Sequence, residues 1–455
     1  MLLQPLFDTA NNRQIGPFVP SFSIVVELED TRLKDVYLKR KLIKKNIKSG
    51  GQSMNKRYSR QVSDSERLWI LMDELCPPYA NQMVLEGKGQ FDIIKWEKAV
   101  REASMANPGS RLKHKGVLKY SKWVDSGKTP MLRVVDGGDW DGLSPENAPF
   151  LKNKLSLKTG SSCEVVLVKG KKHDSVIFRT SHAVMDGSGT QIWAKDIFRI
   201  LRGEEPIGSD CTMTDADLAK TFQDRYRTPL PDEHIAPTGK ATRTRRGVTW
   251  RRIKLKGHYS KILPRVILIT AKEAWKYSDG IVRFCIPVDL RHRKEGLRST
   301  GNLSIGIYIE VTEDSTVESI STDIKNQLEN KNDGVLTNGQ IMFEYLPLWL
   351  LKYKAGQIVK KQQKSGLYSL SGIISNLGLI NPSEFTYAGF KPETCFFIPP
   401  GIEALPYFAT ISGMGGNLEI LVTLPEAFAE TIRFDNIMDS LEQAFKKRPG
   451  KFSQN

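Results

Sequence analysis

Residues 175–189 have the sequence SVIFRTSHAVMDGSG, and this stretch decides how the rest of the chain is interpreted. Its first six residues are mostly β-branched, aromatic or apolar, which is typical of a strand. The segment EVVLVK at 164–169 has the same character, and the polar residues 170–174 between the two predict a hairpin turn. Beyond the stretch, apolar side chains follow a helical spacing at Ile192, Trp193, Ile197 and Leu201. His182 is therefore expected in a tight connection between the end of a strand and the start of a helix.

This connection carries His182, Asp186 and Gly187. A neutral imidazole has a pKa close to neutral pH, so His182 is a candidate general base that takes a proton from an attacking hydroxyl or amine. Asp186 could orient the imidazole as in a catalytic triad, or it could turn away and hold the loop through an arginine. The tight Asp-Gly-Ser-Gly turn favours the second role, and we expect Gly187 to supply backbone freedom there.

Other interpretations of these residues stay open at this point. A histidine at a strand end is often an ordinary polar residue with local hydrogen bonds. A metal site built from His182 and Asp186 is disfavoured, because glycines interrupt the helix and no third ligand is near in the sequence. The glycine-rich run GMGG at 413–416 lacks the Lys-Ser/Thr of a phosphate loop and has strand-like sequence on both sides, so it predicts a hairpin turn.

The segment SHAVMDGSG resembles the HHxxxDG signature of a superfamily of acyl-transferring proteins. This superfamily includes the condensation domains of nonribosomal peptide synthesis, coenzyme A-dependent acyltransferases and chloramphenicol acetyltransferase. In this resemblance His182 matches the second histidine of the signature, which is the catalytic one, and Ser181 replaces the first. The similarity extends over about residues 54–445.

Two more segments carry the resemblance. PVDLR at 287–291 is similar to the segment whose arginine pairs with the signature aspartate, which implies a structural salt bridge between Asp186 and Arg291. SNLG at 375–378 is similar to an element beside the family's tunnel. The residues that the resemblance makes candidates for lining the tunnel or for stabilising an oxyanion are Ser375, Asn376 and Ser181.

The segment pattern predicts an α/β fold with α+β layers, because strands and helices alternate along the chain. The resemblance implies two chloramphenicol acetyltransferase-like lobes that form a V with a tunnel between them. We predict an N-terminal extension at 1–53, a first lobe at 54–220 that carries the His182 motif, a linker at 221–250 and a second lobe at 251–455. The linker is indicated by a run rich in Pro, Asp, Thr and Arg with little periodicity.

The composition narrows the partners. The net charge is +16, and the basic residues cluster at 32–48 and 240–256. Such runs could meet nucleic acid, an acidic carrier protein or coenzyme A phosphates, or could be solvated surface. No nucleic-acid module signature accompanies them, so nucleic acid is the less favoured partner. The five cysteines show no CxxC spacing, and no apolar run approaches the length of a membrane span or a secretory signal, so we expect reduced thiols and a cytoplasmic protein without a span.

The resemblance implies an acyltransferase that moves an acyl group from a phosphopantetheine thioester to an amine or alcohol. The donor would be an acyl or peptidyl carrier protein or acyl-CoA, with no bound cofactor and no metal. His182 would act as general base. Because Ser181 replaces the first signature histidine, two alternatives stay open. The first is a docking or scaffold protein that keeps the fold without catalysis. The second is a basic nucleic-acid-binding protein.

Overall fold

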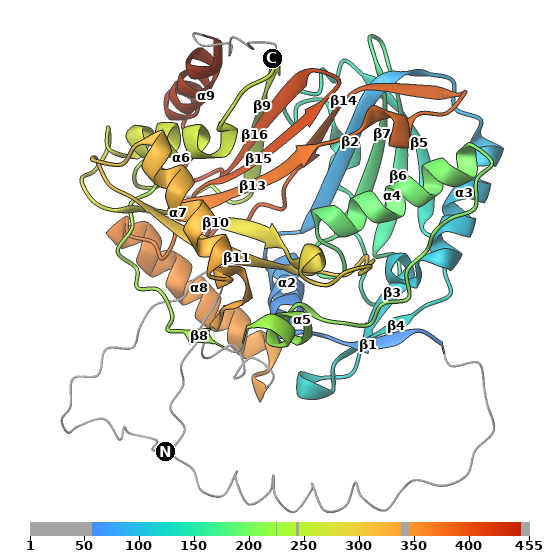
Figure 1. Cartoon of the computed structure of the whole chain (residues 1–455), viewed down its shortest axis with the longest axis horizontal. Coiled ribbons are helices and arrows are strands. Elements are labelled where there is room, and N and C mark those ends of the chain that lie inside the picture. The colour runs from blue at the N-terminus through green and yellow to red at the C-terminus, as the bar shows by residue number, and fades with distance from the viewer. Residues whose placement is uncertain (1–56, 224, 243–244, 338–344, 447–455) are drawn as a thin grey trace, which may run out of the picture.

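The computed structural model describes residues 57–223, 225–242, 245–337 and 345–446. The predicted extension at 1–53 and the basic run at 32–48 lie outside the described residues. Two mixed sheets dominate the described part, and they lie beside one another with helices on their outer faces (Figure 1).

The first sheet is five-stranded, and only its last two strands run parallel. Its strands, in spatial order, are β14 (Phe390–Ile398), β2 (Ala80–Gly89), β7 (Asp174–Ser181), β6 (Cys163–Gly170) and β5 (Met131–Gly138). The hairpin predicted around residues 170–174 is the β6–β7 hairpin, in which Val166 lies opposite Ile177.

The second sheet is six-stranded and mixed. Its strands, in spatial order, are β11 (Ser304–Val311), β10 (Val282–Asp289), β13 (Gly372–Leu379), β15 (Phe408–Met414), β16 (Asn417–Pro425) and β9 (Val248–Lys256). The predicted hairpin turn at 413–416 joins β15 to β16, and both Gly415 and Gly416 adopt positive φ there, which glycine permits without strain. Two small sheets flank the large ones: β1 (Ser59–Gln61), β4 (Lys122–Asp125) and β3 (Leu112–Lys115), and β12 (Leu336–Thr337) with β8 (Tyr226–Arg227).

Helices bury the apolar faces of both sheets. The helices are α2 (Asp64–Leu75), α3 (Ile93–Ala106), α4 (Gly187–Leu201), α5 (Asp215–Phe222), α6 (Ile262–Ala274), α7 (Val317–Glu329), α8 (Leu348–Ser365) and α9 (Thr431–Lys446). Figure 1 shows α3 and α4 over the first sheet and α6, α7 and α9 outside the second. Trp96 and Trp193 are fully buried in the core under α3 and α4, and Phe284 and Phe434 lie in the core of the second sheet.

Several helix starts follow directly from the sequence. Ser63 and Glu66 form the predicted capping box at the start of α2, and the Asp92 side chain accepts a hydrogen bond from the Lys95 amide at the start of α3. Thr214 caps α5 just before the predicted linker at 221–250, because its hydroxyl accepts from the Asp217 amide. The linker itself contains β8 and the start of β9.

The two sheets are joined by a strand and a buried arginine. β14 comes from the second half of the sequence but pairs with β2 of the first sheet. Arg252 on β9 is only 6% exposed and bonds Glu86 of β2 through Nη1 at 2.7 Å and Glu419 of β16 through Nε at 2.7 Å. This guanidinium lies 3.7 Å from the centroid of the Phe396 ring on β14. The predicted boundaries of the lobes remain a prediction, since the sheet pairing mixes the two halves.

Candidate active site

His182 occupies the turn between β7 and α4, as the sequence predicted. Its amide donates to the Tyr79 carbonyl at 3.0 Å, and its Nδ1 lies 3.1 Å from the Met185 carbonyl. A carbonyl oxygen accepts only, so this contact favours the tautomer that has the proton on Nδ1 and a free lone pair on Nε2. The Asn81 side-chain nitrogen also lies 3.2 Å from Nδ1, and it would donate to that atom only in the other tautomer. The Asn81 side-chain amide also donates to the Met185 carbonyl, at 2.7 Å, and fixes the acceptor that orients the ring.

Aromatic rings hold the imidazole in place. The Trp69 ring of α2 stacks on it with centroids 5.0 Å apart and an interplanar angle of 14°, and Tyr79 lies at 5.6 Å. Burial lowers the pKa of His182 below its usual value. The Met185 carbonyl and the Asp186 carboxylate act in the opposite direction, but their effect on the pKa is smaller. The imidazole is therefore neutral at physiological pH, which is the form that accepts a proton.

Asp186 faces away from His182 and toward Arg291. Arg291 Nη2 lies 3.0 Å from Asp186 Oδ1, and Nη1 lies 3.1 Å from Oδ2. The carboxylate also accepts from the Gly189 amide at 2.7 Å, the Leu303 amide at 2.8 Å and the Ser304 hydroxyl at 3.1 Å. Burial by itself would raise the pKa of Asp186, but Arg291 and these donors hold it below its usual range. The loop-holding arrangement is thus present, and the triad arrangement is absent.

The glycines of the motif serve a different purpose from the one expected. Gly187 and Gly189 belong to the first turn of α4 and have no positive φ. A Cβ on Gly189 would lie 2.3 Å from the Thr300 carbonyl oxygen, and one on Gly187 would lie 3.0 Å from a Leu377 methyl group. Close approach of the second half of the chain, rather than turn conformation, therefore requires these glycines.

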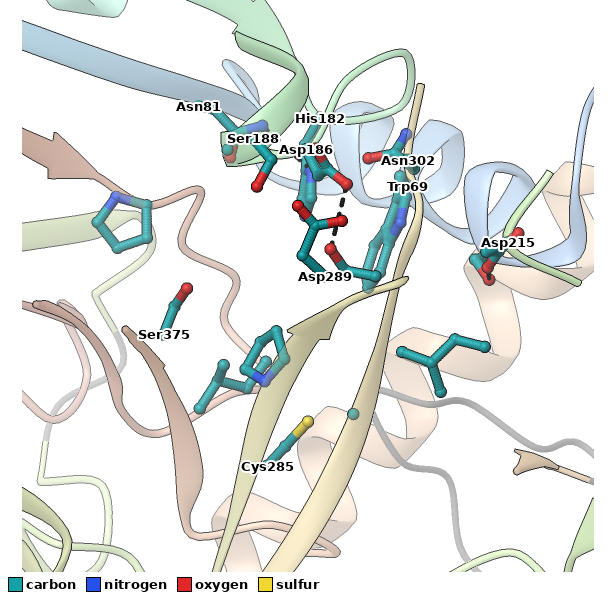
Figure 2. Close-up of a pocket in the computed structure, with 18 of the residues that line it drawn as sticks. Trp69, Asn81, His182, Asp186, Ser188, Asp215, Cys285, Asp289, Asn302 and Ser375 are labelled. Atoms are coloured by element: carbon teal, nitrogen blue, oxygen red, sulfur yellow. Dashed lines mark hydrogen bonds between the residues drawn. The ribbon is translucent and has the colours of Figure 1, made fainter. Parts of the chain in front are cut away.

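A cavity of about 450 Å³ lies in front of His182, between the two sheets. Figure 2 shows His182, Asp186 and Ser188 on one side, with Ser375 and Cys285 on strands of the second sheet across the space. The walls come from both halves of the chain: α2, β2 and the His182 turn on one side, and β10, β11, β13 and β15 on the other. An imidazole at the junction of the two halves therefore faces a space that both of them line.

The three tunnel candidates have different surroundings. Ser375 and Asn376 on β13 both line the cavity. The Asn376 side-chain oxygen Oδ1 accepts from the Gly378 amide at 3.1 Å, which leaves the side-chain NH₂ group available. The structure places Ser181, the third candidate, apart from the other two. It is the last residue of β7, is 1% exposed and lies outside the cavity lining. Successive side chains of a strand point to opposite sides, so the residue before His182 turns inward.

Several residues at the site were missed by the sequence analysis. Asn81 and Trp69 contact the catalytic candidate only through tertiary packing, and nothing in their local sequence marks them. Asp215 also lines the cavity, where it is 2% exposed and bonds the Ser65 hydroxyl; burial raises its pKa to about 6. Cys285 is a further lining residue, and burial raises the pKa of its thiol to about 12, so it remains protonated.

The described residues also bear on other kinds of site. No group of three or more His, Cys, Asp or Glu side chains in this part of the chain could hold a metal ion. All five cysteines are free. None of the described helices combines the length and apolar character that crossing a bilayer requires. Part of the basic run at 240–256 forms ion pairs within the protein. Arg252 is buried between Glu86 and Glu419, and Arg251 pairs with Asp435.

Comparison with known proteins identifies the fold. No family model and no curated protein matches the sequence. Among solved structures, the first condensation domain of the calcium-dependent antibiotic synthetase, in complex with a substrate analogue, superposes with a TM-score of 0.61 at 13% identity, over 87% of this chain and 98% of that one. The condensation domain of the monacolin K polyketide synthase MokA gives 0.56 at 10% identity, over 86% and 98%.

This chain has the condensation-domain fold. The predicted fold class, two chloramphenicol acetyltransferase-like lobes in α/β layers, is therefore confirmed. A mutant of the starter condensation domain of rhizomide synthetase RzmA, in complex with C8-CoA, matches with a TM-score of 0.56 at 12% identity, over 86% of this chain and 95% of that one. The epimerization domain of tyrocidine synthetase B also matches, with a TM-score of 0.50 at 13% identity, over 87% and 98%. The condensation-domain fold thus accommodates more than one reaction.

Proposed function

We propose that this protein is an acyltransferase that uses His182 as general base to move an acyl group from a thioester to an amine or alcohol. The observation that carries the proposal is the orientation of the imidazole. Met185 holds Nδ1 at 3.1 Å, so the basic Nε2 is left for a cavity that both halves of the chain line. Condensation-domain neighbours and the C8-CoA complex of one of them support the reaction class.

The chemistry follows from the residues around the cavity. His182 Nε2 accepts the proton of the nucleophile as its nitrogen or oxygen attacks the thioester carbonyl carbon. The carbon–sulfur bond then breaks, an amide or ester forms, and the thiolate takes the proton back from the imidazolium. The Asn376 amide and the Ser375 hydroxyl are the candidate donors to the oxyanion of the tetrahedral intermediate. Asp186, Gly187 and Arg291 keep the turn that presents His182.

The donor carries a phosphopantetheine arm, either on coenzyme A or on an acyl or peptidyl carrier protein, and the acceptor is a small amine or alcohol. Ser181 does not weaken this proposal, because the position of the first signature histidine lies outside the cavity lining. The side chain that faces the cavity is that of His182, which matches the second histidine of the signature.

The test is transfer from octanoyl-CoA and other acyl thioesters to a panel of amines and alcohols, followed by mass spectrometry. His182→Asn keeps a donor near the position of Nδ1 but lacks Nε2, so we expect transfer to fall by about 10²- to 10⁴-fold. The matched control is His173→Ala, which removes an exposed histidine of the β6–β7 turn and should leave the rate unchanged. Equal rates for wild type and His182→Asn would refute the proposal and favour a scaffold protein.

A second measurement separates acyl transfer from epimerisation. The protein is incubated with an aminoacyl thioester in deuterated water, without acceptor. One outcome would refute acyl transfer: deuterium enters the α-carbon in a His182-dependent way, and the transfer assay gives no product. The proposed reaction would then be proton abstraction at that carbon. We expect transfer and no such exchange.

A further inference from the structure

Exposed aromatic side chains gather at one place outside the cavity. Trp349 and Tyr353 on α8 are 70% and 61% exposed, and they lie one helical turn apart on the same face. Tyr345 just before α8 is 48% exposed, and Tyr120 in the loop before β4 is 54% exposed. In the described part of the chain these are four of the five large aromatic residues that are exposed. We call them, with the exposed Val117, the aromatic patch.

The two segments of the aromatic patch are held together. Lys119 Nζ lies 5.2 Å from the Tyr345 ring centroid and 5.6 Å from that of Tyr120. Arg67 of α2 donates to the Leu346 carbonyl at 2.6 Å and to the Leu118 carbonyl at 3.3 Å. Because one buried arginine binds the backbone of both segments, the patch is a fixed surface rather than two independent loops.

The charge around the aromatic patch has one sign. Helix α8 contains five lysines and neither arginine nor a carboxylate. Lys352 and Lys354 flank Tyr353, are exposed and pair with no carboxylate of the described residues. Lys361, farther along, is the α8 lysine that reaches a carboxylate, Asp232, at 3.7 Å. The exposed face of α8 therefore combines bulky aromatic rings with uncompensated positive charge.

The aromatic patch carries lysine rather than arginine, and this choice of residue indicates which class of partner it binds. Protein–protein interfaces are enriched in arginine and depleted of lysine, and recognition of nucleic-acid phosphates favours the forked guanidinium. Lysine with tryptophan and tyrosine suits a lipid headgroup layer. There the aromatic rings occupy the apolar–polar boundary, and the flexible lysine stems carry their charges to the anionic headgroups.

We propose that the aromatic patch docks this protein on an anionic membrane surface, with Trp349 and Tyr353 entering the headgroup layer and Lys352 and Lys354 contacting anionic lipids. Docking would be peripheral and reversible, and it would not depend on acyl transfer. Helix α2 packs against α8, and its residues Leu68 and Trp69 also line the cavity. The patch is therefore one helix away from the candidate active site, so docking would fix the orientation of the cavity relative to the membrane.

The experiment is sedimentation of the full chain with vesicles of phosphatidylcholine containing about 30% phosphatidylserine, compared with pure phosphatidylcholine, in about 0.1 M salt. We expect binding to the anionic vesicles only. The double variant Lys352→Gln/Lys354→Gln should weaken that binding about 25-fold, from roughly fivefold for each lysine. Trp349→Ser should weaken it as well. On vesicle addition the tryptophan emission of the wild type should shift to the blue, and Trp349→Phe should lose the shift.

Matched controls separate the aromatic patch from general charge. Lys172→Gln/Lys254→Gln removes two exposed lysines elsewhere, and Ile94→Ser removes a 79% exposed apolar side chain of α3. Both should bind vesicles as the wild type does. The proposal is overturned if anionic vesicles are not bound, or if the patch and control variants bind equally. Binding of duplex DNA or of a purified acidic carrier protein through these residues, without vesicle binding, would also overturn it.

Discussion

Replacing Arg291 by alanine should test how the His182 turn is held. The guanidinium is buried, and it bonds Asp186, Asp289 and the carbonyls of Ser299 and Gly301. Arg291→Ala would leave the Asp186 carboxylate 5% exposed with no cation beside it. Leaving a buried charge without its partner costs about 3 to 5 kcal/mol, so we expect a loss of that size in the free energy of unfolding near neutral pH.

The assay is urea unfolding followed by tryptophan fluorescence at several pH values. In the wild type, Arg291 holds the pKa of Asp186 low, so the stability from this pair is present above the unfolded pKa of about 3.9 and is lost as the pH falls through the folded value. In Arg291→Ala the carboxyl takes up a proton more readily, so the gap to wild type should narrow on acidification.

Two further variants make the result decisive. Asp186→Asn combined with Arg291→Ala removes the uncompensated charge and should recover part of the loss. Arg245→Ala breaks an exposed pair with Glu426 at 3.6 Å and should cost less than about 1 kcal/mol. If Arg291→Ala were no more destabilising than Arg245→Ala, the argument that this ion pair holds the turn would fail.

Three other predictions concern the cavity. Because burial lowers the pKa of His182 and the neutral form is the base, the acidic limb of kcat/KM should have its midpoint below pH 6.5; a midpoint above that value would contradict the assignment. Burial raises the pKa of Asp215 to about 6, above the unfolded value, so stability is lost as the pH rises through about 6. Asp215→Asn should therefore be more stable than wild type near pH 8, by up to about 3 kcal/mol, but not near pH 4, as measured by urea unfolding; no pH-dependent difference would refute this. Asn81→Leu removes the donor to the Met185 carbonyl and should lower kcat about tenfold while costing about 1 to 2 kcal/mol of stability; an unchanged kcat would exclude a positioning role.

The sequence predicted elements whose signals are local. The capping box of Ser63 and Glu66, the β6–β7 hairpin and the 413–416 turn all depend on residues that are close together along the chain. The proximity of Asp186 and Arg291 was inferred from a resemblance, because nothing in either local sequence indicates it. Asn81 and Trp69 could not be found this way, since tertiary packing alone brings them to His182.

Two elements were missed for a different reason. Helix α8 has exposed aromatic residues at positions where an amphipathic helix would have polar ones, and this hides its amphipathic period. β14 has the composition of a strand, but no sequence pattern shows that its partner is β2, some 300 residues earlier along the chain. Ser181 became a tunnel candidate because it replaces a signature histidine, and a position in a motif does not indicate toward which side its side chain points.

The exchange of β14 between the halves makes each half an incomplete folding unit. A break in the predicted linker at 221–250 would leave the first fragment without the strand that pairs with β2. The unpaired backbone groups and apolar side chains of β2 would then form an exposed, aggregation-prone sheet edge. The break would also separate the buried ion pair, with Glu86 in one fragment and Arg252 in the other. Such fragments should be recovered in soluble form only when they are produced together, because the two lobes complete one another as a single folding unit.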